Sequence, residues 1–367
     1  MKIKAVVVRE VNNLTVETVT LEPPSTGQVL VRMRAAGVCH SDLHTLRGEL
    51  RATPPLVLGH EGAGTVEAVG PGVNRVKHGD RVIINWLPSC GRCRYCMEGH
   101  PNLCERLADT TFQGKLPDGT SHLRTDDGIL LKHYLSSATM AEYAVVDEAG
   151  VIPIPDDVPF EVAAIIGCAV LTGVGAVLNT AQVRPGRSAA VIGCGGVGLS
   201  AIQGCRLAGC HPIIAVDIMD SKLDLARELG ATDVINARRT DPVEELRKRT
   251  DGGPDYVFDS VGAATTIRQA LEAVRPAGVA VIIGLHAGLQ EIPIPPISLI
   301  LFDKRLLGSF AGSSRPHVDL PRLVELYRAG LLDLDKLISK RYTLEEIERA
   351  FADMEAGNIA RGVLMFD

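Results

Sequence analysis

The hydrophobic pattern of this 367-residue chain changes about halfway along its length. Over roughly the first 150 residues, apolar and polar positions alternate in short stretches such as NLTVETVTLE (residues 13–22) and QVLVRMRAAG (residues 28–37), and Pro and Gly separate these stretches. A period of two is typical of a β-strand with one buried face. The first part of the chain is therefore predicted to be mostly β.

From about residue 187, short apolar runs alternate with amphipathic segments that have helical spacing, such as residues 221–231 and 265–278. This alternation predicts an α/β fold with a doubly wound parallel sheet. The pattern ends near residue 312, so we expect the remaining residues to return to the first domain. The runs predicted as strands are residues 189–193, 212–217, 233–236, 255–259, 279–284 and 305–310.

Composition narrows the functional classes. The chain is 22% charged and 46% hydrophobic, and its net charge is −6 without a block of Lys or Arg, so neither nucleic acid nor an anionic membrane is an expected partner. We identify no signal-peptide core and expect no membrane-spanning run. Nine cysteines without an export signal indicate metal ligation in a reducing cytoplasm rather than disulfides.

Four of these cysteines, Cys90, Cys93, Cys96 and Cys104, are separated by two, two and seven residues. Such spacing predicts a zinc ion held by four thiolates. The alternative is an iron–sulfur cluster, but in the ferredoxin pattern the fourth cysteine follows after three residues and precedes a proline. Here Glu105 follows. Because the protein fills all four positions, the zinc would be structural.

The run GCGGVG follows the apolar run AAVI and precedes a helical segment, as in dinucleotide-binding loops. A tight turn with no ligand is the alternative. Asp217 ends the next predicted strand, where it can accept hydrogen bonds from an adenosine ribose and repel a 2′-phosphate. NAD is therefore favoured over NADP. The predicted loop residues are Gly193, Gly195, Gly196, Val197 and Gly198.

Three further potential zinc ligands are scattered: Cys39 in GVCHSDLH, His60 in LGHEGAG and Cys168 in IIGCAVLTG. Taken singly, Cys168 could be a core thiol and His60 could cap a turn. Together with GHEGAGTVEAVGPGV, CGRCRYC and GCGGVG in this order, they make the chain resemble the zinc-dependent medium-chain alcohol dehydrogenase family along essentially its whole length.

This resemblance implies two domains. A Rossmann NAD-binding domain would span residues 171–312. A mostly β GroES-like catalytic domain would comprise residues 1–170 and 313–367, with a structural-zinc lobe at about residues 88–106. It also implies two zinc ions per subunit, with NAD as the cofactor.

The resemblance implies that Cys39, His60 and Cys168 hold a catalytic zinc, with the fourth position left to water or alcohol. This Cys₂His composition is taken from alcohol dehydrogenases themselves and not from the spacing. Glu61 would lie behind the metal and ligate it transiently. Asp42 would orient the zinc-bound imidazole. Polyol dehydrogenases often have Glu at the position of Cys168, so this residue favours the alcohol dehydrogenase branch.

The resemblance also implies a proton relay and further cofactor contacts. Ser41 would contact the alcohol oxygen, and His44 would be the base at the outer end of the relay through the cofactor ribose, unless it is a surface histidine without a role. The other implied cofactor contacts are His40 and Arg361 on the pyrophosphate, Lys222 near the adenosine ribose, and Thr172 against the nicotinamide.

Residues 105–137 resemble the long insertion of the liver-type and glutathione-dependent formaldehyde dehydrogenase branches. Enzymes acting on the glutathione adduct use an acidic residue near Leu50 and an arginine near Ala108, and this chain has neither at those positions. The nearest charged residues are Glu49, Arg51 and Arg106.

The pocket wall suggested by the resemblance is apolar, so we expect a primary or aromatic alcohol and its aldehyde as substrates. Two alternatives stay open. One is oxidation of a thiol–formaldehyde adduct. The other is a non-catalytic NAD-binding protein, which would be expected to have lost a ligand or the relay, and no such loss is visible. The wall residues are Trp86, Leu107, Tyr134 and Leu135.

The apolar stretch SLILF, residues 298–302, is expected near the edge of the cofactor sheet. An exposed sheet edge tends to pair with another chain. Members of the family pair their sheets in this region. We therefore expect a homodimer, or a tetramer built from such dimers.

Overall fold

A computed structural model describes residues 1–50, 52–285 and 291–367. The chain forms two compact units. The first comprises Met1–Cys168, Arg315–Ala329 and Leu334–Asp367, and the second comprises Ala169–Ser314 and Gly330–Asp333. The chain crosses between the units within two residues of the expected positions, but the short segment at 330–333 was expected in the first unit.

The segment 330–333 belongs to the second unit because polar contacts hold it there. The Asp333 amide donates to Gln203 Oε1 at 2.7 Å, and the Arg206 guanidinium donates to the Leu331 carbonyl at 2.9 Å. Both anchoring side chains lie on helix α6 (Gly196–Leu207). Hydropathy alone gives no sign of these contacts.

The first unit is mostly β, as predicted, and contains a small closed barrel and a seven-stranded sheet. The barrel strands are β1 (Lys2–Glu10), β2 (Asn13–Leu21), β7 (Leu123–Arg124), β8 (Leu130–His133) and β4 (Leu56–Val57). The sheet strands are β10 (Val151–Pro153), β6 (Arg81–Ile84), β5 (Gly62–Val69), β3 (Gln28–Val38), β18 (Arg361–Met365), β17 (Ile338–Tyr342) and β9 (Tyr143–Asp147).

The central strand of this sheet, β3, positions the functional residues of the first unit. It is buried along most of its length because β5, β9 and β18 all pair with it. Ala36 lies opposite Gly62 on β5, and Val38 lies opposite Gly362 on β18. The residues that follow β3, precede β5 and begin β18 therefore meet at one end of the sheet.

Six helices belong to the first unit, among the residues described. They are α1 (His40–Leu46), α2 (Arg94–Met97), α3 (Arg106–Asp109), α4 (Phe160–Ile165), α11 (Pro316–Arg328) and α12 (Ile347–Glu355). Helix α11 and strands β17 and β18 follow residue 312 and lie in the first unit.

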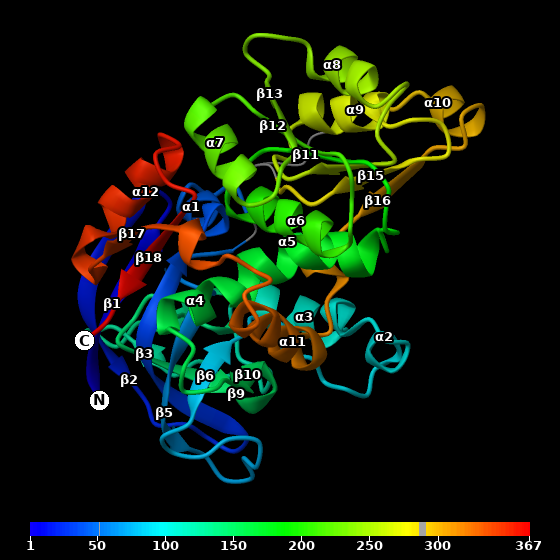
Figure 1. The fold of residues 1–367 in the computed structure, drawn as a ribbon. Helices are drawn as coiled ribbons and strands as arrows, with labels where there is room; N and C mark the ends of the chain where they lie inside the picture. Colours follow the sequence, from blue (N-terminus) through cyan, green and yellow to red (C-terminus); the bar gives the residue numbers. More distant parts are fainter. Residues whose placement is uncertain (51, 286–290) are drawn as a thin grey trace. The chain divides into compact units, whose positions relative to one another are not determined.

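The second unit contains a six-stranded parallel sheet with the order β13-β12-β11-β14-β15-β16, so all six predicted strands are confirmed. Figure 1 shows α6 and α7 on one side of this sheet and α8 and α9 on the other. The strands are β11 (Ala189–Ile192), β12 (Ile213–Asp217), β13 (Asp233–Asn236), β14 (Tyr256–Asp259), β15 (Val279–Ile282) and β16 (Arg305–Gly308). The other helices are α5 (Leu171–Gly175), α7 (Asp220–Glu228), α8 (Pro242–Arg249), α9 (Ala264–Ala273) and α10 (Pro296–Ile300).

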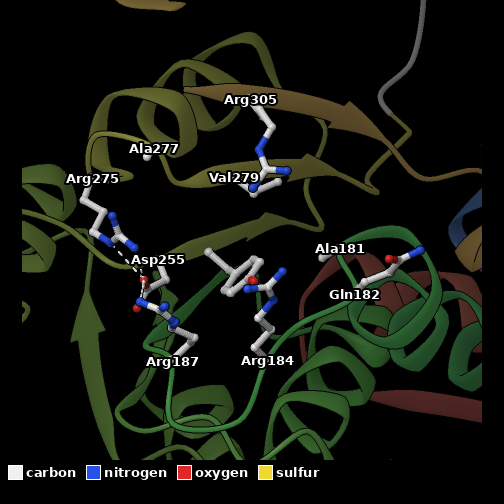
Figure 2. Close-up of a pocket in the computed structure, with 10 residues that line it drawn as sticks. Ala181, Gln182, Arg184, Arg187, Asp255, Arg275, Ala277, Val279 and Arg305 are labelled. Carbon is white, nitrogen blue, oxygen red and sulfur yellow. Dashed lines mark hydrogen bonds and ion pairs between the residues drawn. The ribbon is translucent and has the colours of Figure 1, made fainter. Parts of the chain in front are cut away.

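The two ends of the strands in this sheet carry different features. The glycine-rich loop follows the carboxyl end of β11, where doubly wound sheets bind their ligands. At the opposite end, where the strands begin, there is a cavity of about 310 Å³ (Figure 2).

One expectation about apolar segments needs correction. The helical run Phe160–Thr180 is long and apolar enough to cross a membrane, although we expected no such run; 83% of its most apolar window is buried inside the protein, as in the core helix of a globular domain. The stretch 298–302, which we expected near the edge of the cofactor sheet, begins within helix α10, and β16 is the strand at that edge.

Candidate active site and metal centres

Four potential metal ligands from distant parts of the sequence meet in the first unit. One ligand atom from each of Cys39, His60, Glu61 and Cys168 lies within 4.8 Å of the others. Cys39 directly follows β3 and caps helix α1, while His60 and Glu61 directly precede β5. Cys168 lies on a π-helical turn, Ile166–Val170, a type of helix irregularity frequent at functional sites. The expected catalytic ligands are thus close together.

The His60 imidazole is held in one orientation. Its Nδ1 lies 3.3 Å from Asp42 Oδ1, which also accepts a hydrogen bond from the Gly59 amide at 3.1 Å. The Asp42 carboxylate, which is fully buried, favours the tautomer with hydrogen on Nδ1. The lone pair of Nε2 then faces Ser41 Oγ, 3.4 Å away, on the side of the other ligands.

The two thiols of this group cannot both ionise easily without a cation. Their mutual hydrogen bond lowers the pKa of Cys39 well below its usual value and raises the pKa of Cys168, which burial raises further. A bound cation would stabilise both thiolates. Two sulfurs and one imidazole nitrogen are the donors that zinc prefers, so the residues fit this metal.

Glu61 lies beside the thiols, and its two carboxylate oxygens differ in their contacts. One oxygen accepts from the Arg361 guanidinium at 2.5 Å, and Oε2 has no hydrogen-bond partner among the described residues. Burial raises the pKa of Glu61 to about 8, although Arg361 acts in the opposite direction. Gly37 makes room for this side chain, because a Cβ there would lie 2.2 Å from Glu61 Oε2.

Arg361 makes contacts that the sequence does not predict. The contact with the cofactor pyrophosphate that the resemblance implies stays a prediction; in the structure the Arg361 side chain is buried and donates to the Val38 carbonyl at 2.9 Å as well as to Glu61. The pairing of β18 with β3 brings the first residue of β18 next to the end of β3. No sequence signal links Glu61 to a residue 300 positions away.

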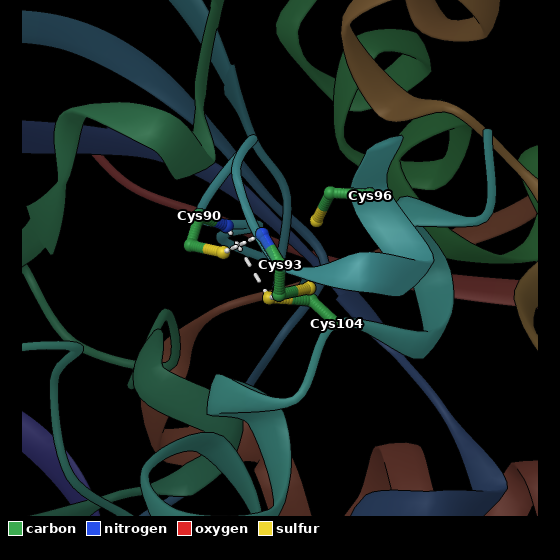
Figure 3. Close-up of side chains that lie close together, drawn as sticks. All are labelled: Cys90, Cys93, Cys96 and Cys104. Carbon is green, nitrogen blue, oxygen red and sulfur yellow. Dashed lines mark hydrogen bonds between the residues drawn. The ribbon is translucent and has the colours of Figure 1, made fainter. Parts of the chain in front are cut away.

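The second cysteine cluster forms in the lobe around α2 (Figure 3). The four sulfurs of Cys90, Cys93, Cys96 and Cys104 lie within 4.8 Å of one another. Burial opposes ionisation of Cys90, but backbone amides, including that of Cys93 at 3.3 Å, lower its pKa to about 6. Burial and the neighbouring thiols raise the pKa of Cys96 to about 12. Four crowded thiols of unequal acidity fit a cation that neutralises them together.

The predicted nucleotide loop combines a tight turn with one open backbone position. A Cβ on Gly195 would meet nothing within 4 Å, so the space beside the start of α6 is open. A Cβ on Gly198 would lie 1.8 Å from the Gly193 carbonyl, and Gly193 itself has a φ of +90°. Glycine is therefore required at 193 and 198 for the turn and its packing, and at 195 the backbone is accessible. Gly196 and Val197 begin helix α6.

Asp217 lies beside this loop, at the end of β12. One carboxylate oxygen accepts from the Cys194 amide at 2.7 Å, and the other accepts from the amides of Ile218 and Met219. The carboxylate is thus held beside the glycine-rich loop by backbone amides, and its contact with a ribose stays a prediction. Lys222, on α7, is half-buried, and Thr172 lies on α5, four residues after Cys168.

The expected relay histidine has a partner that the sequence analysis did not identify. His44 Nδ1 is hydrogen-bonded to Glu49, and both side chains are partly exposed. His40, also on α1, is exposed, and its ring centroid lies 6.2 Å from that of His44. A carboxylate five residues after a histidine is a weak signal, because only the turn after α1 brings the two together.

Aromatic side chains surround the His60 ring. Trp86 and Tyr134 meet it edge-on, with centroid distances of 6.1 and 5.5 Å, and both are largely buried. The Tyr134 hydroxyl donates to the Ser41 carbonyl at 3.0 Å. Of the other expected wall residues, Leu107 is buried and Leu135 half-buried. The expected wall residues are therefore buried or half-buried, beside the polar side chains that contact the ligands.

Comparisons with known proteins agree with this geometry. Residues 25–156 match the alcohol dehydrogenase GroES-like domain family, and residues 196–328 match the zinc-binding dehydrogenase family. The chain is 39% identical to S-(hydroxymethyl)glutathione dehydrogenase of Paracoccus denitrificans, covering 100% of both, and 41% identical to alcohol dehydrogenase class-3 of Myxine glutinosa, covering 96% of this chain and 94% of that one. The structure of benzyl alcohol dehydrogenase from Acinetobacter calcoaceticus is similar over 100% of both chains, with a TM-score of 0.95 and 32% identity.

These matches cover both units and include both cysteine groups and the glycine loop. The chain belongs to the zinc-dependent medium-chain alcohol dehydrogenase family, in its class III-like branch, and is an NAD-dependent oxidoreductase with two zinc sites.

Proposed function

We propose that this enzyme oxidises an apolar primary alcohol, aromatic alcohols above all, so that the alcohol and NAD⁺ give the aldehyde, NADH and a proton. The observation that carries the proposal is the aromatic wall formed by Trp86 and Tyr134 around His60. A phenyl ring gains from edge-to-face contacts with such side chains in addition to the burial of its surface.

The chain's own residues would orient the reactants and carry the proton away. When bound, zinc would lower the pKa of the alcohol, and NAD would accept the hydride. Asp42 keeps the Nε2 lone pair of His60 directed at the ligand group. The Ser41 hydroxyl lies 3.1 Å from Cys39 Sγ, close enough to the ligands to take the alcohol proton while passing its own outward.

A panel of substrates assayed with NAD tests the proposal. Benzyl alcohol should have a kcat/KM roughly a hundredfold above that of S-(hydroxymethyl)glutathione, because buried charges left without partners cost about 2–5 kcal/mol. Glu49 is already bound to His44, and Arg51 lies outside the described residues. The double change Leu50→Asp with Ala108→Arg should reduce the ratio between the kcat/KM for benzyl alcohol and that for S-(hydroxymethyl)glutathione. A wild-type preference for the adduct would refute the proposal.

The names of the relatives support a second candidate. The S-(hydroxymethyl)glutathione dehydrogenase of Paracoccus denitrificans is 39% identical over the full length, a higher identity than that to the benzyl alcohol enzyme. If the panel gives the adduct the highest kcat/KM, Arg106, which is half-buried, becomes the residue to test for the substrate carboxylates.

The relay leads to a prediction about pH. His44→Gln should lower the rate of alcohol oxidation most at low pH, where the alcohol is hardest to deprotonate, and should not change the zinc content. General bases typically contribute about 10²–10⁴-fold, but water can bypass an outer relay residue, so the loss should be about a hundredfold or less. Ser41→Ala should cost more. Stopped-flow measurement of NADH formation across pH checks both variants.

Three comparisons sharpen the relay test. Glu49→Gln retains an acceptor for His44 Nδ1 and should reduce the rate less than His44→Gln does. Added imidazole should partly restore the His44 variant but not the Ser41 variant. Wild-type pH–rate profiles in both the His44 and Ser41 variants would mean that the proton leaves by another route.

We also propose that the enzyme is a homodimer in which α10 and the residues after it contribute to the interface. Ile300 and Leu301 are 74% and 67% exposed, and Phe302 is 49% exposed. Burying such side chains contributes about 1.5–3 kcal/mol each. Leu301→Glu should therefore shift the molecular mass measured by light scattering toward that of the monomer. A wild-type monomer at micromolar concentration would contradict the proposal.

A further inference from the structure

A cavity of about 310 Å³ opens in the second unit, at the amino ends of the strands of its sheet (Figure 2). Tyr256, Val279 and Arg305 are the first residues of β14, β15 and β16, and Arg187 lies just before β11. The full lining is Ala181, Gln182, Arg184, Arg187, Asp255, Tyr256, Arg275, Ala277, Val279 and Arg305.

This cavity is separate from the nucleotide loop. The loop follows the carboxyl end of β11, whereas the cavity lies at the amino ends of the strands. A strand rises about 3.3 Å per residue, so the four residues of β11 separate its amino end, near the cavity, from its carboxyl end, near the loop, by about 13 Å. A ligand in the cavity would therefore not be part of the cofactor.

The charge of the lining is strongly unbalanced. Four arginines and one aspartate line the cavity, which leaves an excess of three positive charges (4 − 1 = 3). Asp255 is already engaged, since one oxygen accepts from Arg275 Nε at 2.8 Å and from Arg187 at 3.2 Å. The other accepts from the Ser188 hydroxyl and amide, so the carboxylate neutralises only part of the cluster.

Two of the arginines have no such partner. Within the described parts of the chain, Arg184 and Arg305 make no side-chain hydrogen bond or ion pair, although Asp255 lines the same cavity. Figure 2 shows the Arg305 side chain, from β16, and the Arg184 side chain, from the loop before β11, reaching into the cavity from opposite sides. Guanidinium groups held close together repel one another, and a shared anion would remove that repulsion.

Shape and chemistry define the class of anion. The planar fork of arginine matches the oxygens of phosphate in pairs, and several forks around one concave space suit an anion with more than one phosphate group. The volume exceeds that of one phosphate, and Tyr256, which is largely buried, also lines the cavity. We propose that this cavity is a binding site for a small polyphosphate anion, independent of the dehydrogenase reaction.

Isothermal titration calorimetry of the full-length, zinc-loaded enzyme with inorganic pyrophosphate tests the proposal. Saturating NAD is present throughout to block the nucleotide loop, and the ionic strength is held constant. We expect saturable binding of one pyrophosphate per chain, and a lower affinity when the titration is repeated at a higher salt concentration. Elemental analysis after the titration checks that pyrophosphate has not removed zinc.

The test variant is Arg184→Gln with Arg305→Gln. Neither side chain makes a hydrogen bond or ion pair with the described residues, so the protein should keep its zinc, its alcohol turnover and its melting temperature without ligand. Its affinity for pyrophosphate should fall roughly tenfold or more, because it loses two charge-assisted contacts. The control is Arg238→Gln with Arg268→Gln, two exposed arginines of the second unit outside the cavity, which removes the same charge.

The outcomes separate a built site from general attraction to positive charge. Loss of pyrophosphate binding in the test variant, with wild-type affinity in the control, supports the site. Equal weakening in both variants, or no saturable binding to the wild-type enzyme, overturns it. Because turnover is measured on the same samples, failure of this inference is distinguishable from failure of the proposed reaction.

Discussion

Replacing Cys168 with alanine should reduce kcat for alcohol oxidation by about a thousandfold or more, and the variant should contain one zinc per chain instead of two. The change removes one sulfur from the group formed with Cys39 and His60. A metal that polarises the reacting oxygen contributes several kcal/mol, and each ~1.4 kcal/mol corresponds to a factor of ten in rate. Elemental analysis and steady-state kinetics on the same sample measure both effects.

Cys205→Ala is the matched control for this variant. Cys205 is also a buried thiol on a helix, and it belongs to neither potential metal site among the described residues. It should retain two zinc ions and nearly the wild-type kcat, so that any loss from repacking a buried thiol is measured separately. A Cys168 variant with two zinc ions and normal turnover would remove this residue from the catalytic site.

Replacing Cys93 with alanine should destabilise the enzyme strongly and leave one zinc per chain. Cys93 is half-exposed, so its packing alone would predict a small loss. If its sulfur holds a structural zinc, the loss should exceed about 3 kcal/mol, the upper end for ordinary substitutions. At roughly 2–4 °C per kcal/mol for domains of this size, the melting temperature should fall by about 6 °C or more.

Cys210→Ala provides the comparison for stability. Cys210 lies outside both cysteine groups and is more buried than Cys93, so packing alone would make its replacement the costlier one. The opposite order of melting temperatures is expected if Cys93 binds zinc. A Cys93 variant that melts like the wild type and keeps two zinc ions would show that this cluster does not hold a structural metal.

The sequence was sufficient where a feature depends on residues close together in the chain. The spacing of Cys90, Cys93 and Cys96 within one loop, the glycines from 193 to 198, and the six apolar runs of the parallel sheet are all local patterns. Backbone conformation and side-chain periodicity act over a few residues, so these patterns carry their structural meaning within themselves.

The grouping of Cys39, His60 and Cys168 was a different kind of prediction, because it came from resemblance to a family. Nothing in the spacing of three ligands spread over about 130 residues requires them to meet. The structure brings them together through the pairing of β3 with β5 and through the π-helical turn at Cys168. The need for glycine at position 37, which leaves room for the Glu61 carboxylate, can be recognised only in the structure.

By itself, the sequence determined the two-part fold, the cysteine spacing of the lobe and the nucleotide loop. Only the tertiary structure decided that Arg361 pairs with Glu61, that residues 298–300 lie in helix α10, and that arginines from three segments line one cavity. The physical reason is that strand pairing and side-chain burial join residues far apart in sequence, and no periodicity along the chain records which distant segments will meet.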